Sequence, residues 1–165
     1  LVHIVKQNDR HLARLINPHQ NNELSANISD KNAVSQCTFK GLQTQMGMFD
    51  VYASILATPV STAFGVHEEQ NQDLTSHAMT SGLLNQEVLR LSRYALATNL
   101  IAGCQAVDLR GGKSRLSPAT RPIYTWVRKS VPYIETEQPL GHFVELIASQ
   151  LADPTFLNLI LDALQ

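Results

Sequence analysis

The residues best suited to chemistry lie in one short stretch, HEEQNQDLTS at positions 67–76, which holds three acids, three amides and a histidine. If this stretch is helical, Glu68 and Gln72 are four residues apart and share one face of the helix. A carboxylate beside a carboxamide could hold an ammonium group and a carbonyl-like oxygen of the same ligand. A plainer interpretation stays open, in which the stretch is a solvent-exposed cap for the helix that follows.

Other motifs give weaker signals for catalysis or binding. Residues 111–114 read GGKS, like the end of a phosphate-binding loop, but they follow a predicted helix instead of a strand, and valine stands where that motif begins with glycine. The six histidines form no set with metal-ligand spacing, so no metal site is predicted. Cys37 and Cys104 form no disulfide framework, which favours the reducing cytoplasm.

The composition indicates a helical protein with balanced charge. The 165 residues are 44% hydrophobic and carry 13 basic and 14 acidic side chains, for a net charge of −1. That balance argues against nucleic acid as a partner. No apolar run approaches the roughly 20 residues of a membrane-spanning helix, so a membrane is not expected as a partner either. The chain begins at Leu1 inside an amphipathic pattern without an initiator methionine, and we expect it to be a piece of a longer polypeptide.

Hydrophobic spacing predicts an all-α fold whose longest helix follows the polar stretch. Helical patterns are expected over residues 1–16, 36–57, 74–109, 119–130 and 140–151 and from 154 onward. Asp153 with Pro154 is typical of a helix start, and Gly111 with Gly112 is typical of a helix end. At 1.5 Å per residue, the longest helix would measure about 50 Å, which predicts a long-helix bundle of the kind shared between subunits. We divide the chain into a bundle part, 1–110, and a C-terminal helical segment, 111–165.

Several short motifs, in the same order along the chain, resemble the aromatic amino acid lyases, which include phenylalanine, tyrosine and histidine ammonia-lyases and aromatic aminomutases. These motifs are Asp9-Arg10, Asn17-Pro18, Phe39-Lys40-Gly41-Leu42-Gln43, Ala57-Thr58-Pro59-Val60, Glu68 with Asn71-Gln72-Asp73, Gln105-Ala106-Val107-Asp108-Leu109-Arg110 and Leu116-Ser117-Pro118-Ala119-Thr120. The resemblance covers nearly the whole chain and is strongest to bacterial phenylalanine ammonia-lyases. It implies a helical core assembled as a homotetramer, with active sites built from more than one subunit.

The resemblance also implies a mechanism and assigns roles to two residues. Members of the family carry an electrophilic methylidene-imidazolone group, formed by cyclisation of an internal Ala-Ser-Gly, which activates an aromatic amino acid for loss of ammonia. Glu68 matches the glutamate that lies by the substrate amine and the prosthetic group. Gln72 matches the next polar group of the active site and is the one candidate for binding the cofactor. Both are therefore the expected catalytic and substrate-binding residues.

The same two positions bear on the choice of substrate. Histidine lyases of the family have a glutamate at the position of Gln72 and no acid at the position of Glu68. The presence of Glu68 together with Gln72 therefore favours phenylalanine or tyrosine as the substrate.

One departure from the family pattern decides how far the resemblance applies. No Ala-Ser-Gly occurs in the 165 residues, and the tyrosines Tyr52, Tyr94, Tyr124 and Tyr133 match no catalytic motif of the family. We therefore expect the chain to be the C-terminal part of an ammonia-lyase that converts L-phenylalanine to trans-cinnamate, inactive alone and completed by an upstream part of the same polypeptide. Three alternatives stay open: a tyrosine or histidine ammonia-lyase, an aromatic 2,3-aminomutase, and a catalytically silent helical oligomerisation module.

Overall fold

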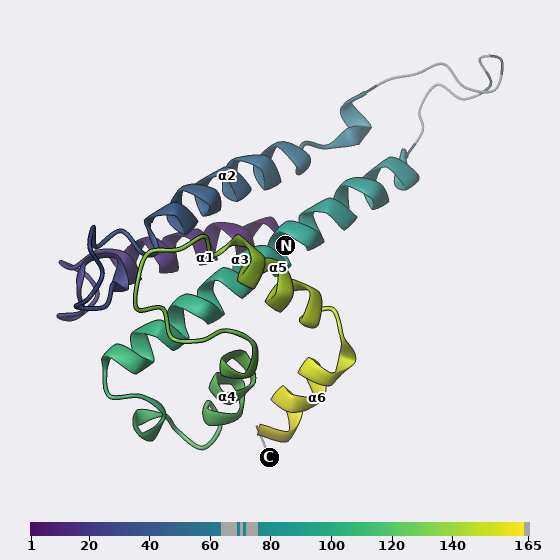
Figure 1. The fold of residues 1–165 in the computed structure, drawn as a ribbon. Coiled ribbons are helices and arrows are strands. Elements are labelled where there is room, and N and C mark those ends of the chain that lie inside the picture. The colour runs from purple at the N-terminus through teal and green to yellow at the C-terminus, as the bar shows by residue number, and fades with distance from the viewer. Residues whose placement is uncertain (64–68, 70, 72–75, 164–165) are drawn as a thin grey trace.

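The computed structural model describes residues 1–63, 69, 71 and 76–163, and every regular element in these ranges is helical (Figure 1). The α-helices are α1 (Val2–Ile16), α2 (Lys40–Leu56), α3 (Ala78–Leu109), α4 (Arg121–Ser130), α5 (Gly141–Gln150) and α6 (Pro154–Ala163), and the short 3-10 helices are η1 (Ala26–Ile28), η2 (Val60–Thr62) and η4 (Lys113–Arg115). The all-α prediction is confirmed. No helix in the described ranges combines the length and apolar character needed to cross a bilayer.

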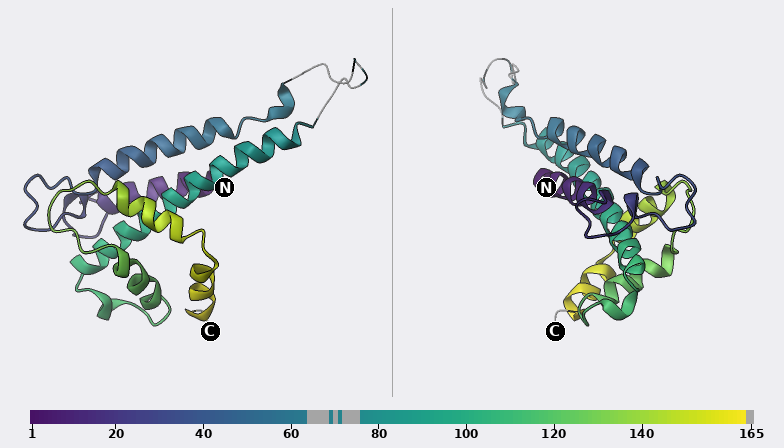
Figure 2. Two further views of the ribbon diagram at one scale, coloured as in Figure 1. Left: turned by 45° about the vertical axis from the view of Figure 1, so that its right-hand side comes forward. Right: turned by 90° about the vertical axis from the view of Figure 1, so that its left-hand side faces the viewer.

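The long helix α3 is the axis on which the other helices pack. Its 32 residues correspond to about 48 Å, close to the predicted length. The helices α1, α2 and α5 pack against α3, α4 packs against its C-terminal part, and α6 packs against α4 (Figure 1, Figure 2). The first ten residues of α3, 78–87, and the connection after α2, residues 57–63, extend beyond the rest of the bundle, and we call them the arm.

A continuous apolar core runs beside the later part of α3. Its fully buried members include Val5, Leu12, Phe39, Met46, Ala95, Ile101, Val127, Ile134 and Ile147. Removal of such side chains from water is the main favourable contribution to folding. Gln105, like Thr98, is a polar side chain that is fully buried. Its Nε2 donates to the Ile134 carbonyl at 2.8 Å and its Oε1 accepts the Ile134 N–H at 3.1 Å, which ties the segment after α4 to α3.

Two predicted helix boundaries, the end of α3 and the start of α6, are confirmed at the expected residues. At the end of α3, Gly111 and Gly112 have φ angles of 104° and 79°, which favour glycine. Their N–H groups donate to the carbonyls of Asp108 and Val107 at 3.0 and 2.9 Å, the pattern of a Schellman motif. At the start of α6, Asp153 Oδ1 accepts the Thr155 N–H at 2.8 Å, as expected of an N-cap.

The start of α2 differs from the prediction. The helix was expected from Gln36 and begins at Lys40, because Gln36 has a left-handed backbone with φ 50°. The flanking N–H groups of Ser35 and Cys37 donate to a carboxylate oxygen of Glu137 at 3.1 and 3.4 Å. A side chain about one hundred residues away thus holds this segment outside the helix.

Candidate functional site

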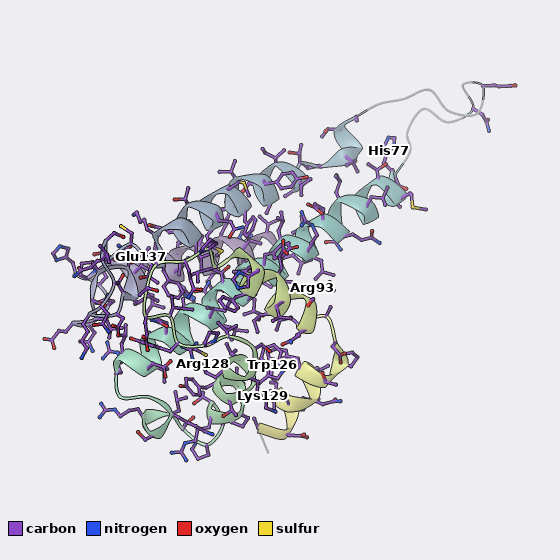
Figure 3. The ribbon with its side chains drawn as sticks, viewed as in Figure 1. His77, Arg93, Trp126, Arg128, Lys129 and Glu137 are labelled. Carbon is purple, nitrogen blue, oxygen red and sulfur yellow. The ribbon has the colours of Figure 1, made fainter. Side chains whose placement is uncertain are left out.

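The two expected site residues, Glu68 and Gln72, lie outside the described residues, and so do Leu74 and Thr75 at the expected start of the long helix. Residues on either side of this undescribed stretch, among them Ala63 and His77, are described. His77 Nε2 lies 3.0 Å from the Ala63 carbonyl oxygen, so the two ends of the connection meet side by side at the end of the arm (Figure 3). Glu69 and Asn71 are exposed.

A pocket of about 280 Å³ lies where the arm joins the bundle. The ends of three helices line it, through Leu1, Val2, Leu56, Ala57, Thr58, Pro59, Val60, Ser81, Leu84, Asn85 and Val88. Most of these side chains are apolar, and Thr58, Ser81 and Asn85 are the polar ones. Among the described residues no acidic side chain lines the pocket, so these residues alone could accommodate an apolar group but could not hold an ammonium group.

Carboxylates on the nearby helices are held in ion pairs. In α3, Glu87 Oε1 accepts a hydrogen bond from Arg90 Nη2 at 2.5 Å, and this bond lowers the pKa of Glu87. Between α1 and α2, Lys6 Nζ lies 2.6 Å from Asp50 Oδ1. Burial, and then repulsion by Asp50, raise the pKa of Asp9. None of these carboxylates lines the pocket, and the two pairs act as links within or between helices.

A second polar cluster joins α3 to α4, and the sequence did not predict it. Asp108 accepts hydrogen bonds from the Tyr124 hydroxyl and from Arg128 Nη2, and Arg128 Nη1 also donates to the carbonyls of Val131 and Pro132. Burial, and then the bond to Asp108, raise the pKa of Tyr124. Arg128 Nε is buried and has no hydrogen-bond partner within the part of the chain that the structure describes. Since every other group is paired within the chain, we interpret the cluster as a structural joint.

The motif that begins at Phe39 lies at the other end of α2. A groove of about 510 Å³ runs between the first turns of α2 and α5, with Gly41 and Gly141 among its lining residues. Phe39 itself is fully buried. The 17 residues of α2 correspond to about 25 Å. The helix therefore separates this motif from the arm, to which the polar stretch is attached.

The comparisons with known proteins agree with these motifs. The family model described as aromatic amino acid lyase matches residues 1–129. A tyrosine ammonia-lyase of Cupriavidus metallidurans is 28% identical over 152 residues, which are 92% of this chain and 28% of that protein. A histidine ammonia-lyase of Fusobacterium nucleatum is 26% identical over 142 residues, covering 86% of this chain and 27% of that protein.

Solved structures show the same relationship. The tyrosine aminomutase of Streptomyces globisporus superposes with a TM-score of 0.88 and 26% identity, over 98% of this chain and 31% of that chain. The Pantoea agglomerans phenylalanine aminomutase gives a TM-score of 0.86 and 25% identity, over 91% and 29% of the two chains. This chain therefore spans less than a third of the length of these relatives. Because the family model matches well over half of its residues, the chain belongs to the aromatic amino acid lyase family.

Proposed function

We propose that this chain is the C-terminal part of an ammonia-lyase that eliminates ammonia from L-phenylalanine to give trans-cinnamate. The observation that carries the proposal is the family match over residues 1–129, a range that contains both Glu68 and Gln72. The relatives are more than three times longer than this chain. We therefore propose that an upstream part of the same polypeptide completes the active site and that the 165 residues alone are inactive.

The proposed roles follow from the chemistry of the two side chains. An ionised Glu68 would attract the substrate ammonium group, and partial burial would raise its pKa toward the range in which it can accept a proton from the amine. Gln72 would donate its amide N–H to a carbonyl oxygen, as the ring carbonyl of an imidazolone requires. When bound, the methylidene-imidazolone supplies the electrophile. No Ala-Ser-Gly occurs here, so the group would come from outside these residues.

A homotetramer is the proposed assembly. Two family motifs lie at opposite ends of α2, about 25 Å apart, so a site that used both would draw them from different chains. Apolar side chains on α2 and on the arm are also left uncovered, namely Met48, Val51, Tyr52, Ile55, Met79 and Leu83. Exposed apolar surface of this kind is typical of protein interfaces.

The test uses the full-length protein and two neighbouring glutamates. We expect Glu68→Ala to lower kcat for phenylalanine by a factor on the order of a hundred or more, because an acid–base group is lost. Glu69→Ala removes the same charge from an exposed side chain and should change kcat by less than about twofold. Sedimentation should give the same oligomer for both variants. Unchanged turnover in Glu68→Ala would contradict the site assignment.

The second candidate is an aromatic 2,3-aminomutase, or a lyase for tyrosine or histidine. It is favoured by the names of the similar proteins, which include tyrosine and phenylalanine aminomutases and tyrosine and histidine ammonia-lyases. Product analysis with each amino acid separates an unsaturated acid from a β-amino acid. Absence of both products with all three amino acids would favour the silent oligomerisation module.

Two further proposals stand on the sequence. We propose the cytoplasm as the compartment, because the two cysteines provide no disulfide framework. We also propose that residues 1–110 form the bundle part and 111–165 a separate C-terminal segment, since α3 ends at Leu109 and the chain turns at the next two glycines.

A further inference from the structure

The segment from Arg110 to Ile134 is strongly basic in a chain whose net charge is −1. It contains no acid and six cations: Arg110, Lys113, Arg115, Arg121, Arg128 and Lys129. Two of the six are engaged within the chain, since Arg128 pairs with Asp108 and Arg110 donates to the carbonyls of Asn21 and Asn22. The other four form no ion pair within the described part of the chain.

Three of these four cations border one groove. It has a volume of about 580 Å³ and lies between η4, α4 and α6, with Lys113, Arg121 and Lys129 beside the apolar Pro122, Trp126 and Leu159. None of the lining residues that the structure describes is acidic. Figure 3 shows Trp126 and Lys129 on the side of α4 that faces α6. Volumes of this size are usual for small-molecule sites.

The indole of Trp126 provides a fixed apolar wall. Its ring packs against the buried Phe156 of α6, with the ring centroids 4.5 Å apart and the planes inclined by 41°. Trp126 is only partly buried and also lines the groove. An aromatic ring held in this way can accept a second ring against its remaining surface.

The guanidinium of Arg121 is held by one edge. Its Nε donates to the Leu116 carbonyl at 2.9 Å, while its two terminal nitrogens form no hydrogen bond among the residues that the structure describes. A guanidinium with both terminal nitrogens available is suited to a carboxylate, because it can donate two parallel hydrogen bonds. The groove thus pairs an oriented anion-binding group with an aromatic wall.

We propose that this groove binds small aromatic carboxylates, with the ring against Trp126 and the carboxylate at Arg121. A neutral ligand would leave the three cations without a partner, and a purely inorganic anion would make no use of the apolar wall. The inference does not rest on the proposed reaction, because no residue of the groove belongs to the 67–76 stretch. The family match also ends at residue 129, before α6 begins.

The test compares three probes on the 165-residue protein: 3-phenylpropionate, its uncharged analogue 3-phenylpropanamide, and propionate, which lacks the ring. Because Trp126 is the single tryptophan, its fluorescence reports occupation of the groove, and calorimetry gives the affinities. We expect 3-phenylpropionate to bind at least about tenfold more tightly than either of the other probes. Equal binding of the amide, or no binding of 3-phenylpropionate in the millimolar range, would overturn the proposal.

A matched pair of variants separates the groove from the general charge of the segment. Arg121→Gln should weaken binding of 3-phenylpropionate at least about fivefold, because the paired hydrogen bonds are lost. Arg115→Gln removes the same charge from a side chain outside the groove lining and should weaken binding by less than about twofold. Equal effects of the two variants would contradict a specific site. If Arg121→Gln does not fold, Lys129→Gln replaces it, because Lys129 is an exposed side chain that lines the groove. Lys129→Gln should then weaken binding of 3-phenylpropionate more than Arg115→Gln does.

Discussion

The arm part of α3 and the rest of that helix have similar side chains and different surroundings. Between residues 88 and 106 the helix contributes many buried side chains, whereas residues 78–87 contain none that is buried. Leu91 is 1% exposed and Leu83, eight positions earlier in the same helix, is 60% exposed. Helical spacing of apolar residues therefore continues past the point where the neighbouring helices of this chain cover it. The later part of α3 stabilises the fold, and the arm offers an uncovered surface.

The largest difference in the free energy of unfolding is expected when a leucine is replaced by alanine in each of these two parts of α3. Leu91→Ala should lower the free energy of unfolding by about 3 kcal/mol, because it removes buried contacts and leaves a cavity. Leu83→Ala should lower it by less than about 0.5 kcal/mol, since little surface is buried there. Urea denaturation at a concentration where the protein is monomeric measures both. Similar losses would mean that the arm is packed within the single chain.

A second contrast compares two glutamines of α3, one buried and one exposed. Gln105→Ala leaves the N–H and the carbonyl of Ile134 buried without partners, which should lower the free energy of unfolding by about 2 kcal/mol. Gln86→Ala alters an exposed side chain of the arm and should have an effect near zero. The same denaturation experiment compares the two variants. A small effect for Gln105→Ala would show that water replaces the lost amide.

The sequence predicted most of this fold because the helices depend on local signals. Apolar spacing located α1 and α3, and the residue pairs Gly111–Gly112 and Asp153–Pro154 marked helix ends that the structure confirms. The start of α2 was wrong because Glu137, far along the chain, binds the residues just before it. No local pattern could indicate that contact.

For the sites, too, the sequence indicated residues that are close together in the chain and missed those that only the fold brings together. The pair Glu68 and Gln72 came from motif resemblance, and its position in space stays a prediction. The cluster of Asp108, Tyr124 and Arg128 was missed because Asp108 lies on α3, 16 and 20 residues before its two partners on α4, and no local pattern indicates a contact between two helices. The groove at Trp126 was missed for a related reason, since its walls come from segments that only the fold brings together.

The exposed first part of α3, residues 78–87, should govern self-association. Leu83→Glu places a charge on the uncovered apolar surface and should weaken association about tenfold, or about 1.4 kcal/mol. The free energy of unfolding of the monomer should stay the same within error. Gln86→Glu adds the same charge to the arm at a position that is already polar, and it serves as the control. Sedimentation velocity over a range of concentrations distinguishes them, and equal weakening by both variants would point to a general charge effect.

The smallest expected effect lies in the Glu137 contact, and it disappears in acid. Its carboxylate accepts hydrogen bonds from the backbone N–H groups of Val34, Ser35 and Cys37 and from the Ser35 hydroxyl, at 3.0 to 3.4 Å. Hydrogen bonds from its own backbone N–H, from Ser35 and from Cys37 hold the pKa of Glu137 below its ordinary value of 4.5.

Because the folded pKa is the lower one, the ionised carboxylate stabilises the folded state above about pH 4.5, and this contribution disappears as the pH falls through the folded pKa. Glu137→Gln should therefore unfold at lower urea concentration than the native protein near neutral pH, and the difference should shrink as the solution is made more acidic. Glu145→Gln removes a carboxylate of α5 that accepts no hydrogen bond within the described ranges, and it should leave the acid dependence unchanged. A constant difference between Glu137→Gln and the native protein at all pH values would show that the glutamate contributes through packing, and that the loop before α2 does not depend on its charge.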